Sequence, residues 1–559
     1  MAPAAPVLQH IKTPLRPDQR QLVLASHPDR HFVNYLLEGI KAGFRIGFDY
    51  ATHSCVPARG NMLSTLDHPE VVSEYLEKEL KEGRITEITE LSGIMGIQIS
   101  PFGVIPKKSA GQWRLILDLS SPHGRSVNDG IDKSLCSLSY ISVDNIARQV
   151  VRLGRGTNLA KMDVKSAYRL VPVHPQDRVL LGMQWKQRLF VDNALPFGLR
   201  SAPKIFTAIA DVLEWVIKQR GVAMVHHYLD DFITLGEPDT ATCAHNLQVI
   251  IETCEQLGVT VAIDKCEGPT VCLTFLGIEI DTMAMEMQLP AEKLKKLQDT
   301  LQKWRGCKAC TKWELLSLIG QLDHACKVVK PGRIFLSQMI KLSTVVQRLD
   351  HHVRLNQAFW ADLEWWWVYL AQWNGVSLLW DQEQPSITLT SDASGSWGCG
   401  AFWAAHWFQL PWPQSLPHLH ITVKELIPIV IAAAVWGKSW SESHVWVKCD
   451  NAAVVHILNQ GYSRDPEVMH LLRCLHFITA QFNFRVTAEH IQGTLNTAAD
   501  ALSHNSLHTF KVLMPHANQS STQIPHTLVD LLMGSKPDCS PPVGQLCSVL
   551  FRPLSGIFY

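Results

Sequence analysis

The chain has 559 residues, of which 46% are hydrophobic and 18% are charged. This composition excludes a disordered chain, and the length exceeds what a single core supports, so about three or four domains are expected. Lys plus Arg and Asp plus Glu both number 51, so the net charge is zero. The balance argues against an overall basic nucleic-acid-binding protein, although basic clusters lining a channel remain compatible with it.

The N-terminus and the cysteines both bear on where the protein is located. No basic region followed by an apolar segment opens the chain, and the longest apolar run, 426–436, falls short of the roughly 20 residues needed to span a bilayer. The 14 cysteines are scattered, as is typical of reduced thiols inside a cell. The CxxC at 307–310 has no second pair at zinc-site spacing, so a structural role is favoured there. We expect a soluble intracellular protein without a membrane segment.

The first 120 residues change from a helical to a β-like pattern. Helices are expected over 29–46 and 70–83, and two strands joined by a turn are expected over 100–108 and 112–119. Lys107, Lys108 and Arg114 lie near that turn. They either hold phosphate groups or are ordinary solvated charges of a hairpin.

The middle of the chain carries three acidic residues at predicted strand ends. A buried strand over 159–164 contains Asp163 beside a chain reversal, and Asp230 and Asp231 interrupt the apolar run 226–235. Adjacent side chains of a straight strand point to opposite faces, so these two acids serve one site only if the backbone turns there. A β-hairpin with its acids at the tip is therefore expected. Taken alone, an Asp pair between strands is also typical of an ordinary turn.

The remaining pattern predicts a helical region followed by an alternating one. Before residue 386 we expect helices over 204–219, 240–257, 290–304 and 312–327 and strands over 259–265 and 273–280. Trp360, Trp365, Trp366, Trp367 and Trp373 form a tryptophan-rich stretch, for which helix packing is favoured over stacking on bases. After a linker near 382–386 we expect strands over 387–392, 398–403, 444–450 and 484–490 and helices over 423–436 and 498–502.

Asp163, Asp230 and Asp231 would form one carboxylate site on neighbouring antiparallel strands. Carboxylates combined with water and substrate phosphates are the ligands that Mg²⁺ prefers. Two such ions about 3.5–4 Å apart stabilise both the attacking and the leaving oxygen of an in-line phosphoryl displacement. That is the chemistry of nucleotidyl transfer.

Four motifs extend this interpretation. The runs Lys161–Tyr168, Leu195–Pro203, Tyr228–Asp231 and Phe275–Ile278 read KMDVKSAY, LPFGLRSAP, YLDD and FLGI. Their order and spacing over about 98–281 resemble those of reverse transcriptases of the retroviral and LTR-retrotransposon type. The runs at 27–30, 43–48 and 373–378 resemble the DIRS group of tyrosine-recombinase retrotransposons.

The resemblance implies a role for each matching residue. Asp163 and Asp230 would be the principal metal ligands, with Asp231 as the second acid of the pair. Lys107 and Arg114 would grip the incoming triphosphate, and Tyr168 would exclude a ribose 2′-hydroxyl. Phe197 stands where some retroviral enzymes carry Gln, which favours a packing contact over a polar one. Lys265 matches a lysine proposed to protonate departing pyrophosphate, the alternative being an ordinary solvated lysine.

A second acidic set consists of Asp392, Glu425, Asp450 and Asp500. Strand-end and helix-borne acids converge in this way only if a sheet carries the helices on its faces. The runs 390–394, 423–425, 448–450 and 498–502 resemble a ribonuclease H domain over about 386–504. The resemblance implies two Mg²⁺ ions and makes His490 a proton shuttle, with a structural histidine as the alternative. The run 392–395 is also similar to an aspartic-protease motif, but no companion strand pattern supports that interpretation.

The predicted fold class is an α+β and α/β multidomain chain, a right-hand polymerase of fingers, palm and thumb followed by a ribonuclease H-like domain. The expected segments are a helical extension (1–90), fingers and palm (91–281), thumb and connection (282–385), ribonuclease H-like domain (386–505) and a poorly ordered tail (506–559). The predicted function is an RNA-directed DNA polymerase with ribonuclease H activity. Its partners would be an RNA template, a DNA primer, an RNA–DNA hybrid and deoxynucleoside triphosphates, with two Mg²⁺, or alternatively Mn²⁺, in each site. The alternative is a domesticated or decayed element product that binds nucleic acid without catalysis; all six principal acids are present, which favours intact chemistry.

Overall fold

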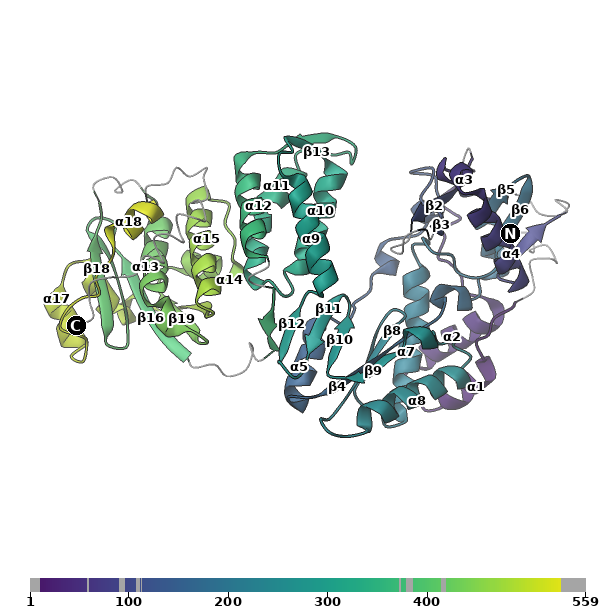
Figure 1. The fold of residues 1–559 in the computed structure, drawn as a ribbon, viewed down its shortest axis with the longest axis horizontal. Coiled ribbons are helices and arrows are strands. Elements are labelled where there is room, and N and C mark those ends of the chain that lie inside the picture. Colours follow the sequence, from purple (N-terminus) through teal and green to yellow (C-terminus); the bar gives the residue numbers. More distant parts are fainter. Residues whose placement is uncertain are drawn as a thin grey trace. The chain divides into compact units, whose positions relative to one another are not determined.

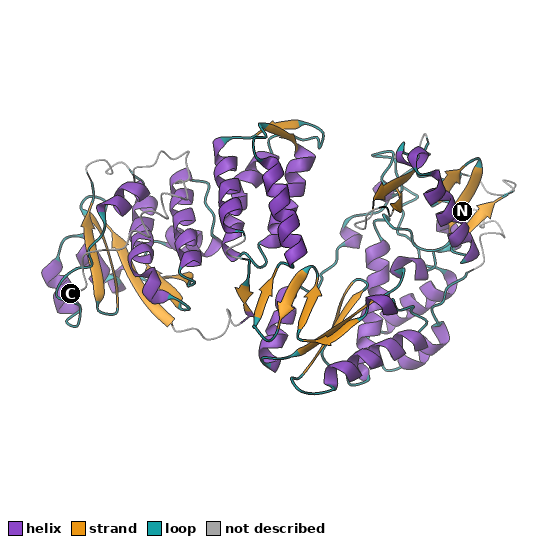
Figure 2. Cartoon of the chain, viewed as in Figure 1, coloured by secondary structure: helices purple, strands orange, loops and turns teal. Residues whose placement is uncertain are grey.

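The computed structural model describes residues 11–57, 60–89, 96–106, 111, 113–370, 374–378, 386–413 and 419–533. The chain divides into two compact units, one formed by residues 1–276 and 280–284 and the other by residues 277–279 and 285–559. Both units mix helices with sheets (Figures 1 and 2). Among the described residues, no helix has the length and apolarity required to cross a membrane.

The first unit begins with helices, as the sequence predicts. They are α1 (Pro17–Val23), α2 (Arg30–Ala42), α3 (Ser64–Asp67) and α4 (Pro69–Lys81). Helix α2 ends before the predicted residue 46 because Gly43 adopts a φ of 86°. A Cβ at Gly43 would lie 2.5 Å from the backbone nitrogen of His174, so only glycine fits at this crossing.

Two small sheets follow these helices. β2 (Phe102–Pro106) and β3 (Trp113–Leu117) form the antiparallel pair predicted over 100–119. β1 (Ile85–Ile88), β6 (Arg188–Asp192) and β5 (Gly182–Trp185) form a three-stranded sheet in that order, which the sequence pattern did not indicate. Lys107 and Lys108 of the predicted turn lie outside the described residues.

The central sheet of the first unit has the strand order β7-β8-β4-β9. Its strands are β4 (Asn158–Asp163), β7 (Val225–Tyr228), β8 (Asp231–Gly236) and β9 (Glu267–Thr270), and α7 (Ala202–Gln219) and α8 (Thr242–Gln256) pack against it (Figure 1). The other elements between them are α5 (Val143–Leu153), η4 (Ala167–Leu170) and α6 (Pro175–Arg178). β10 (Cys272–Phe275) and β11 (Ile278–Asp281) follow. Every predicted acid of the first site therefore lies on or beside one sheet.

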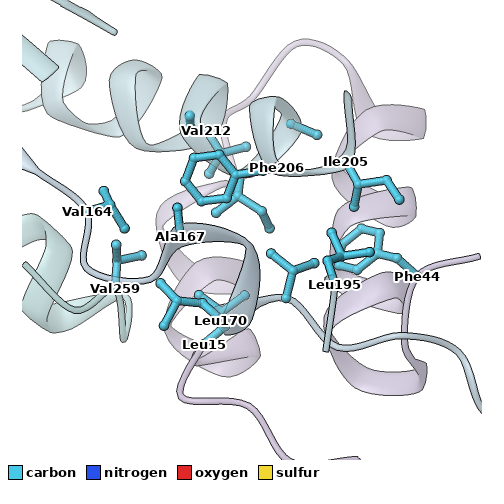
Figure 3. Close-up of a cluster of buried hydrophobic side chains, with 14 of the residues drawn as sticks. Leu15, Phe44, Val164, Ala167, Leu170, Leu195, Ile205, Phe206, Val212 and Val259 are labelled. Carbon is cyan, nitrogen blue, oxygen red and sulfur yellow. The ribbon is translucent and has the colours of Figure 1, made fainter. Parts of the chain in front are cut away.

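A hydrophobic core surrounds the segment that follows β4. Val164, Ala167 and Leu170 point into it together with Ile205, Phe206 and Val212 of α7, and Leu15 and Phe44 approach from the N-terminal segment (Figure 3). All of these side chains are buried. The core holds the chain reversal after Asp163 between segments that are distant in sequence.

The strand predicted over 259–265 is not formed. Val261 makes only an isolated bridge to Val164, and Ile263–Lys265 form the 3-10 helix η5. The turn arises because the backbone N–H of Ala262 donates to the carbonyl of Asp163 over 2.9 Å, while the N–H of Lys265 donates back to Ala262. Lys265 is thereby carried toward the end of β4.

The first part of the second unit is helical. It contains α9 (Ala291–Trp304), α10 (Lys312–Ala325), α11 (Ser337–Ser343) and α12 (Gln357–Tyr369), with the strand pairs β12 (Glu286–Gln288) with β15 (Val376–Ser377) and β13 (Ala309–Thr311) with β14 (His352–Arg354). Trp365 and Trp366 on α12 are fully buried, and the Trp365 ring stacks on Phe335 at 4.2 Å. Helix packing is thus confirmed for these two tryptophans, whereas Trp373 lies outside the described residues.

The second part of this unit is a five-stranded sheet in the order β18-β17-β16-β19-β20. Its strands are β16 (Ser386–Ala393), β17 (Gly398–Trp403), β18 (His406–Pro411), β19 (His444–Cys449) and β20 (Arg485–His490), and its helices are α13 (Ile421–Trp436), α14 (Ala452–Gln460), α15 (Pro466–Gln481) and α16 (Thr497–Ser503). β17 and β18 pair antiparallel, whereas β16, β19 and β20 run parallel. This topology confirms the predicted α+β and α/β multidomain fold class, with an α/β domain in the last part of the described chain.

Residues 506–533, where we expected a poorly ordered tail, pack against this sheet. α17 (Leu507–Leu513) contributes the buried Phe510 to a cluster with Trp407, and α18 (His526–Met533) follows. The indole Nε1 of Trp407 donates to the carbonyl of Asn518 over 2.7 Å. The sequence analysis missed this packing because the segment contains few hydrophobic residues. A small number of contacts nevertheless holds it in place.

Candidate active sites

The first candidate site is centred on a two-residue hairpin turn. β7 ends at Tyr228 and β8 begins at Asp231, directly opposite it, so Leu229 and Asp230 form the turn. Leu229 has a φ of 54°, which belongs to the turns that match the twist of a two-residue hairpin. The N–H of Val164 donates to the carbonyl of Asp230 over 3.0 Å. The predicted hairpin is confirmed, and its turn is joined to the end of β4.

The strand register brings the three predicted acids together. Asp163 of β4 pairs with Asp231 of β8, and directly opposite residues project from the same face of a sheet. Burial, followed by the charges of Asp230 and Asp163, raises the pKa of Asp231 to about 6. Burial and the charge of Asp163 also raise the pKa of Asp230. The acids repel one another, so a cation would stabilise their ionised forms.

Lys265 is the predicted residue that meets this group directly. Its Nζ donates to Oδ1 of Asp163 over 2.9 Å, and this hydrogen bond is the main reason that the pKa of Lys265 is raised. The lysine side chain is 61% exposed, so its ammonium group is open to an approaching substrate. Lys161, by contrast, is paired with Glu267 at 2.6 Å.

Tyr168 and Phe197 lie next to each other. The Tyr168 ring is 5.2 Å from the Phe197 ring and 5.8 Å from that of Phe206. Burial, with a contribution from the charge of Asp230, raises the pKa of Tyr168 to about 12. Phe197 is 55% exposed, and its ring contacts that of Tyr168; its expected packing contact with a nucleotide stays a prediction.

Arg114 and Phe197 line one cavity of about 540 Å³. Arg114 lies on β3, opposite Ile105 of β2, and the aromatic rings of Tyr75 and Trp113 also line the cavity. A cationic group beside aromatic walls suits a molecule that carries both a flat ring and an anion. Lys107, the other predicted triphosphate residue, lies outside the described residues.

A buried ion-pair network supports this region, and the sequence analysis did not identify it. Arg169 contacts Oε2 of Glu79 and Oδ1 of Asp192, both at 2.7 Å, and all three side chains are at most 5% exposed. The guanidinium also donates to the carbonyls of Ala194 and Leu195. The sequence contained a signal for this network, since Arg169 lies between the apolar Tyr168 and Leu170. An arginine that is buried in such a position must be paired.

The second candidate site lies at one edge of the five-stranded sheet. β16, β19 and β20 are parallel, so their carboxyl ends meet at the same edge. Asp392 is near the end of β16, Asp450 follows β19, and His490 ends β20 in register with Cys449. His490 Nε2 is 3.0 Å from the carbonyl oxygen of Asp450. Three of the predicted residues are thus placed together by the parallel register.

Glu425 approaches these strands from α13. The neighbouring Lys424 donates from Nζ to the carbonyl of Gly395 over 2.7 Å, which holds the helix against the end of β16. Glu425 is only 5% exposed, and burial, followed by the charges of Asp392 and Asp450, raises its pKa to about 9. Its Oε2 is buried without a hydrogen-bond partner among the described groups. A buried oxygen of this kind is suited to binding a cation.

α16 contributes Asp500 and several groups that the sequence analysis missed. Asn496 donates to Oδ1 of Asp392 over 3.2 Å, and the Ser503 hydroxyl donates to Oδ2 of the same carboxylate. His504 Nδ1 lies 3.2 Å from Oδ1 of Asp500. The four-residue spacing of Asp500 and His504 could have predicted their proximity, because residues at this spacing lie on the same face of a helix.

The donor set of the second site fits divalent metal ions. Two groups in the described part of the chain, Asp392 with Asp500 and His504, and Glu425 with Cys449 and Asp450, have ligand atoms within 4.8 Å of one another. Burial raises the pKa of Cys449 to about 12, so its thiol stays protonated and the carboxylates are the effective ligands. Oxygen donors suit Mg²⁺ and Mn²⁺. Asp163, Asp230 and Asp231 do not form a set whose ligand atoms all lie within 4.8 Å of one another.

Comparison with protein families and curated proteins yields one consistent description. Residues 105–280 match the family model described as "Reverse transcriptase (RNA-dependent DNA polymerase)". An enzymatic polyprotein of Carnation etched ring virus is 23% identical over 378 residues, which are 64% of this chain and 53% of the polyprotein. An enzymatic polyprotein of Cauliflower mosaic virus (strain D/H) is 20% identical over 468 residues, which are 80% of this chain and 64% of the polyprotein. The chain thus spans only a half to two thirds of the length of these relatives.

Comparison with solved structures finds foamy viral protease-reverse transcriptases. A foamy viral protease-reverse transcriptase in complex with double-stranded DNA aligns over 88% of this chain and 84% of that chain, with a TM-score of 0.49 and 14% identity. A foamy viral protease-reverse transcriptase in complex with an RNA/DNA hybrid aligns over 88% of this chain and 63% of that chain, with a TM-score of 0.47 and 15% identity.

Proposed function

We propose that this chain, which contains a reverse transcriptase domain over residues 105–280, is an RNA-directed DNA polymerase that also cleaves the RNA strand of RNA–DNA hybrids. The observation that carries the proposal is the register of β4 and β8, which sets Asp163 opposite Asp231 with Asp230 in the adjoining turn. Three mutually repelling carboxylates beside an exposed lysine are suited to holding cations and a triphosphate. The similarity to viral enzymatic polyproteins is consistent with this activity.

In the polymerase site each residue has a separate task. Asp163 and Asp230, with Asp231 as the second acid, would hold two Mg²⁺ or Mn²⁺ ions, which when bound activate the primer 3′-hydroxyl and neutralise phosphate charge. The Tyr168 ring excludes a ribose 2′-hydroxyl, so deoxynucleoside triphosphates are preferred. Arg114, together with Lys107, binds the triphosphate. Lys265 Nζ donates a proton to the departing pyrophosphate, for which its exposed position beside Asp163 is suitable.

In the nuclease site the acids divide into buried and accessible members. Asp392, Glu425, Asp450 and Asp500 would hold two metal ions, which when bound generate hydroxide from water and stabilise the leaving 3′-oxygen. Glu425 and Asp392 are buried, whereas Asp500 is exposed toward an approaching strand. His490, exposed at the end of β20, accepts and releases protons during product release.

The polymerase half is tested by primer extension on an RNA template with Mg²⁺. Asp163→Asn and Asp230→Asn should each abolish extension, because each removes a charge needed to hold the cations. Asp299→Asn is the matched control, since Asp299 is an exposed carboxylate of α9 with a 3.9 Å pair to Lys295. Wild-type extension by Asp230→Asn would show that the polymerase site is assigned to the wrong residues.

The nuclease half is tested on a labelled RNA–DNA hybrid. Asp450→Asn and Glu425→Gln should lose hybrid cleavage while they keep primer extension, and Asp163→Asn should show the opposite pattern. This crossed pattern also excludes a contaminating nuclease. If Asp450→Asn cleaves the hybrid at the wild-type rate, the nuclease assignment fails. Wild-type protein that binds the hybrid but neither extends nor cleaves would instead support the non-catalytic alternative.

We further propose that the chain derives from a DIRS-type retrotransposon and has the segment boundaries 90, 281 and 385, with the last domain extending beyond 505 to include residues 506–533. The runs at 27–30 and 43–48 support this placement. A tyrosine-recombinase reading frame in the flanking genomic DNA is the expected finding, and an integrase frame there would contradict it.

A further inference from the structure

His504 lies at the edge of the nuclease site, and none of the roles proposed above involves it. It caps the C-terminal end of α16, one turn after Asp500. Its Nδ1 lies 3.2 Å from Oδ1 of Asp500. The ligand atoms of Asp392, Asp500 and His504 are all within 4.8 Å of one another. One imidazole and two carboxylates thus converge on a volume of the size that a metal ion occupies.

Independent contacts show that this arrangement is built. Asp392 is held on one oxygen by Asn496 and on the other by Ser503, so its orientation is determined from two sides. The Ser503 hydroxyl is also 3.0 Å from Nδ1 of His504, which links the histidine to the same carboxylate. Glu425, whose pKa is raised by burial and by the charges of Asp392 and Asp450, is 5% exposed, and its Oε2 has no hydrogen-bond partner in the described structure. An unpartnered buried oxygen beside the cluster points to a cation that completes it.

We propose that His504 is a direct imidazole ligand of the divalent cation held by Asp392 and Asp500. The inference rests on the proposed nuclease function and adds a nitrogen ligand to its carboxylate set. An imidazole nitrogen favours Mn²⁺ and later transition metals relative to Mg²⁺, whereas carboxylate oxygens accept both Mg²⁺ and Mn²⁺. The nuclease site therefore prefers Mn²⁺ more strongly than the polymerase site, whose group of Asp163, Asp230 and Asp231 includes no histidine in the part of the chain described here.

Coordination is tested with Mn²⁺ alone, by electron spin-echo envelope modulation of the full-length chain. The parent protein carries Asp163→Asn, which weakens binding at the polymerase site. We expect ¹⁴N modulation from a bound imidazole in the parent and its loss in His504→Asn, with Mn²⁺ affinity weakened about 10-fold. His508→Asn is the matched control, because His508 is an exposed histidine of the neighbouring α17. Modulation that persists in His504→Asn, or is absent in the parent, overturns the proposal.

The functional readout is the ratio of hybrid cleavage in Mn²⁺ to that in Mg²⁺. His504→Asn should lower this ratio about 10-fold, while the same ratio for primer extension stays unchanged. Asp450-dependent cleavage with an unchanged ratio and unchanged ¹⁴N modulation in His504→Asn refutes only the role of His504. Wild-type cleavage by Asp450→Asn refutes the nuclease function itself, so the two failures are distinguishable.

Discussion

At the scale of single residues, the acids of the first site differ in how they are held. Asp163 accepts a hydrogen bond from Lys265, whereas Asp231 faces Asp163 across the strands and has its pKa raised to about 6. Asp230 sits in the turn, where the backbone rather than a neighbouring strand determines its direction. The site therefore contains one charge-paired acid and two that depend on a bound cation.

Tyr168 provides the first prediction at this scale. Tyr168→Val should raise ribonucleotide incorporation relative to deoxynucleotide incorporation about 10-fold or more, corresponding to about 1.4 kcal/mol of lost discrimination. The ring that contacts Phe197 and Phe206 would be replaced by a side chain too short to meet a 2′-hydroxyl. Tyr168→Phe keeps the ring and should keep the discrimination. Single-nucleotide incorporation assays measure it, and equal selectivity of the Val and Phe variants would contradict the role.

Lys265 provides the second prediction. If its Nζ supplies the proton to pyrophosphate, Lys265→Met should slow single-turnover extension about 100-fold, a typical contribution of a general acid. Lys265→Arg keeps the pairing with Asp163 but is a much poorer proton donor. Restoration of the wild-type rate by Arg would therefore assign Lys265 to charge pairing alone. Rapid-quench kinetics with saturating nucleotide distinguish the two outcomes.

At the scale of elements, η4 connects β4, which ends at Asp163, to the paired rings of Tyr168 and Phe197. Ser166 has a left-handed φ of 55°, after which Ala167 and Leu170 enter the core (Figure 3). Tyr168 is partly buried against the same core, and its ring lies beside that of Phe197. Arg169 points the other way, toward Glu79 of α4 and Asp192 of β6. The short helix is thus anchored on both sides, which keeps Tyr168 in place.

The prediction at this scale concerns that anchor. Arg169→Met should lower the free energy of unfolding of the first unit by about 3–5 kcal/mol, because it leaves the buried Glu79 and Asp192 without their partner. Arg188→Met, which removes the exposed pair with Glu87, should cost about 0–1 kcal/mol. Hydrogen exchange of peptides covering 188–197 measures the local change. Equal exchange in the two variants would contradict the anchoring role.

Much of this element-level organisation is visible in the sequence, and the exceptions have physical causes. The helices of the N-terminal region, the β2–β3 pair and the hairpin at Asp230 follow from periodicity and turn residues. The strand predicted over 259–265 failed because the Ala262 hydrogen bond to Asp163 turns the chain there. The pairing of β1 with β6 was missed because these strands are about a hundred residues apart in sequence, and the local β5–β6 hairpin was also missed.

At the scale of the whole molecule, the second unit joins its helical part to its sheet through a buried ion pair. Arg473 of α15 donates to Oδ1 of Asp362 on α12 over 2.7 Å, and the two side chains are 8% and 0% exposed. Removal of either partner would leave a buried charge unpaired. The helical segment and the ribonuclease H-like segment are therefore parts of one packed unit, although the sequence pattern suggests a linker between them.

The stability of the second unit toward unfolding is predicted to depend on pH through His476. Burial on α15 lowers the pKa of His476 to about 4, whereas an unfolded histidine titrates near 6.5. As the pH falls below 6.5 the unfolded chain takes up a proton that the folded chain refuses until about pH 4, so stability is lost over this window. The loss amounts to about 1.4 kcal/mol at pH 5.5.

The test compares urea midpoints of the second unit's transition at pH 7.5 and 5.5 in the full chain. His476→Leu should reduce the shift between the two midpoints, whereas His508→Leu, at an exposed position, should leave it as in the wild type. An identical pH shift in His476→Leu and the wild type would show that His476 does not contribute to acid sensitivity.

The sequence by itself determined the acids, their motifs and the order of the elements that carry them, because residue type and periodicity are local properties. Asp163, Asp230, Glu425 and Asp450 could all be selected without a structure. Only the tertiary structure decided the pairing of Asp163 with Asp231, the attachment of Asp392 to Ser503 and the position of His504 beside Asp392. These contacts depend on strand register and helix packing between residues far apart in sequence, which no local pattern encodes.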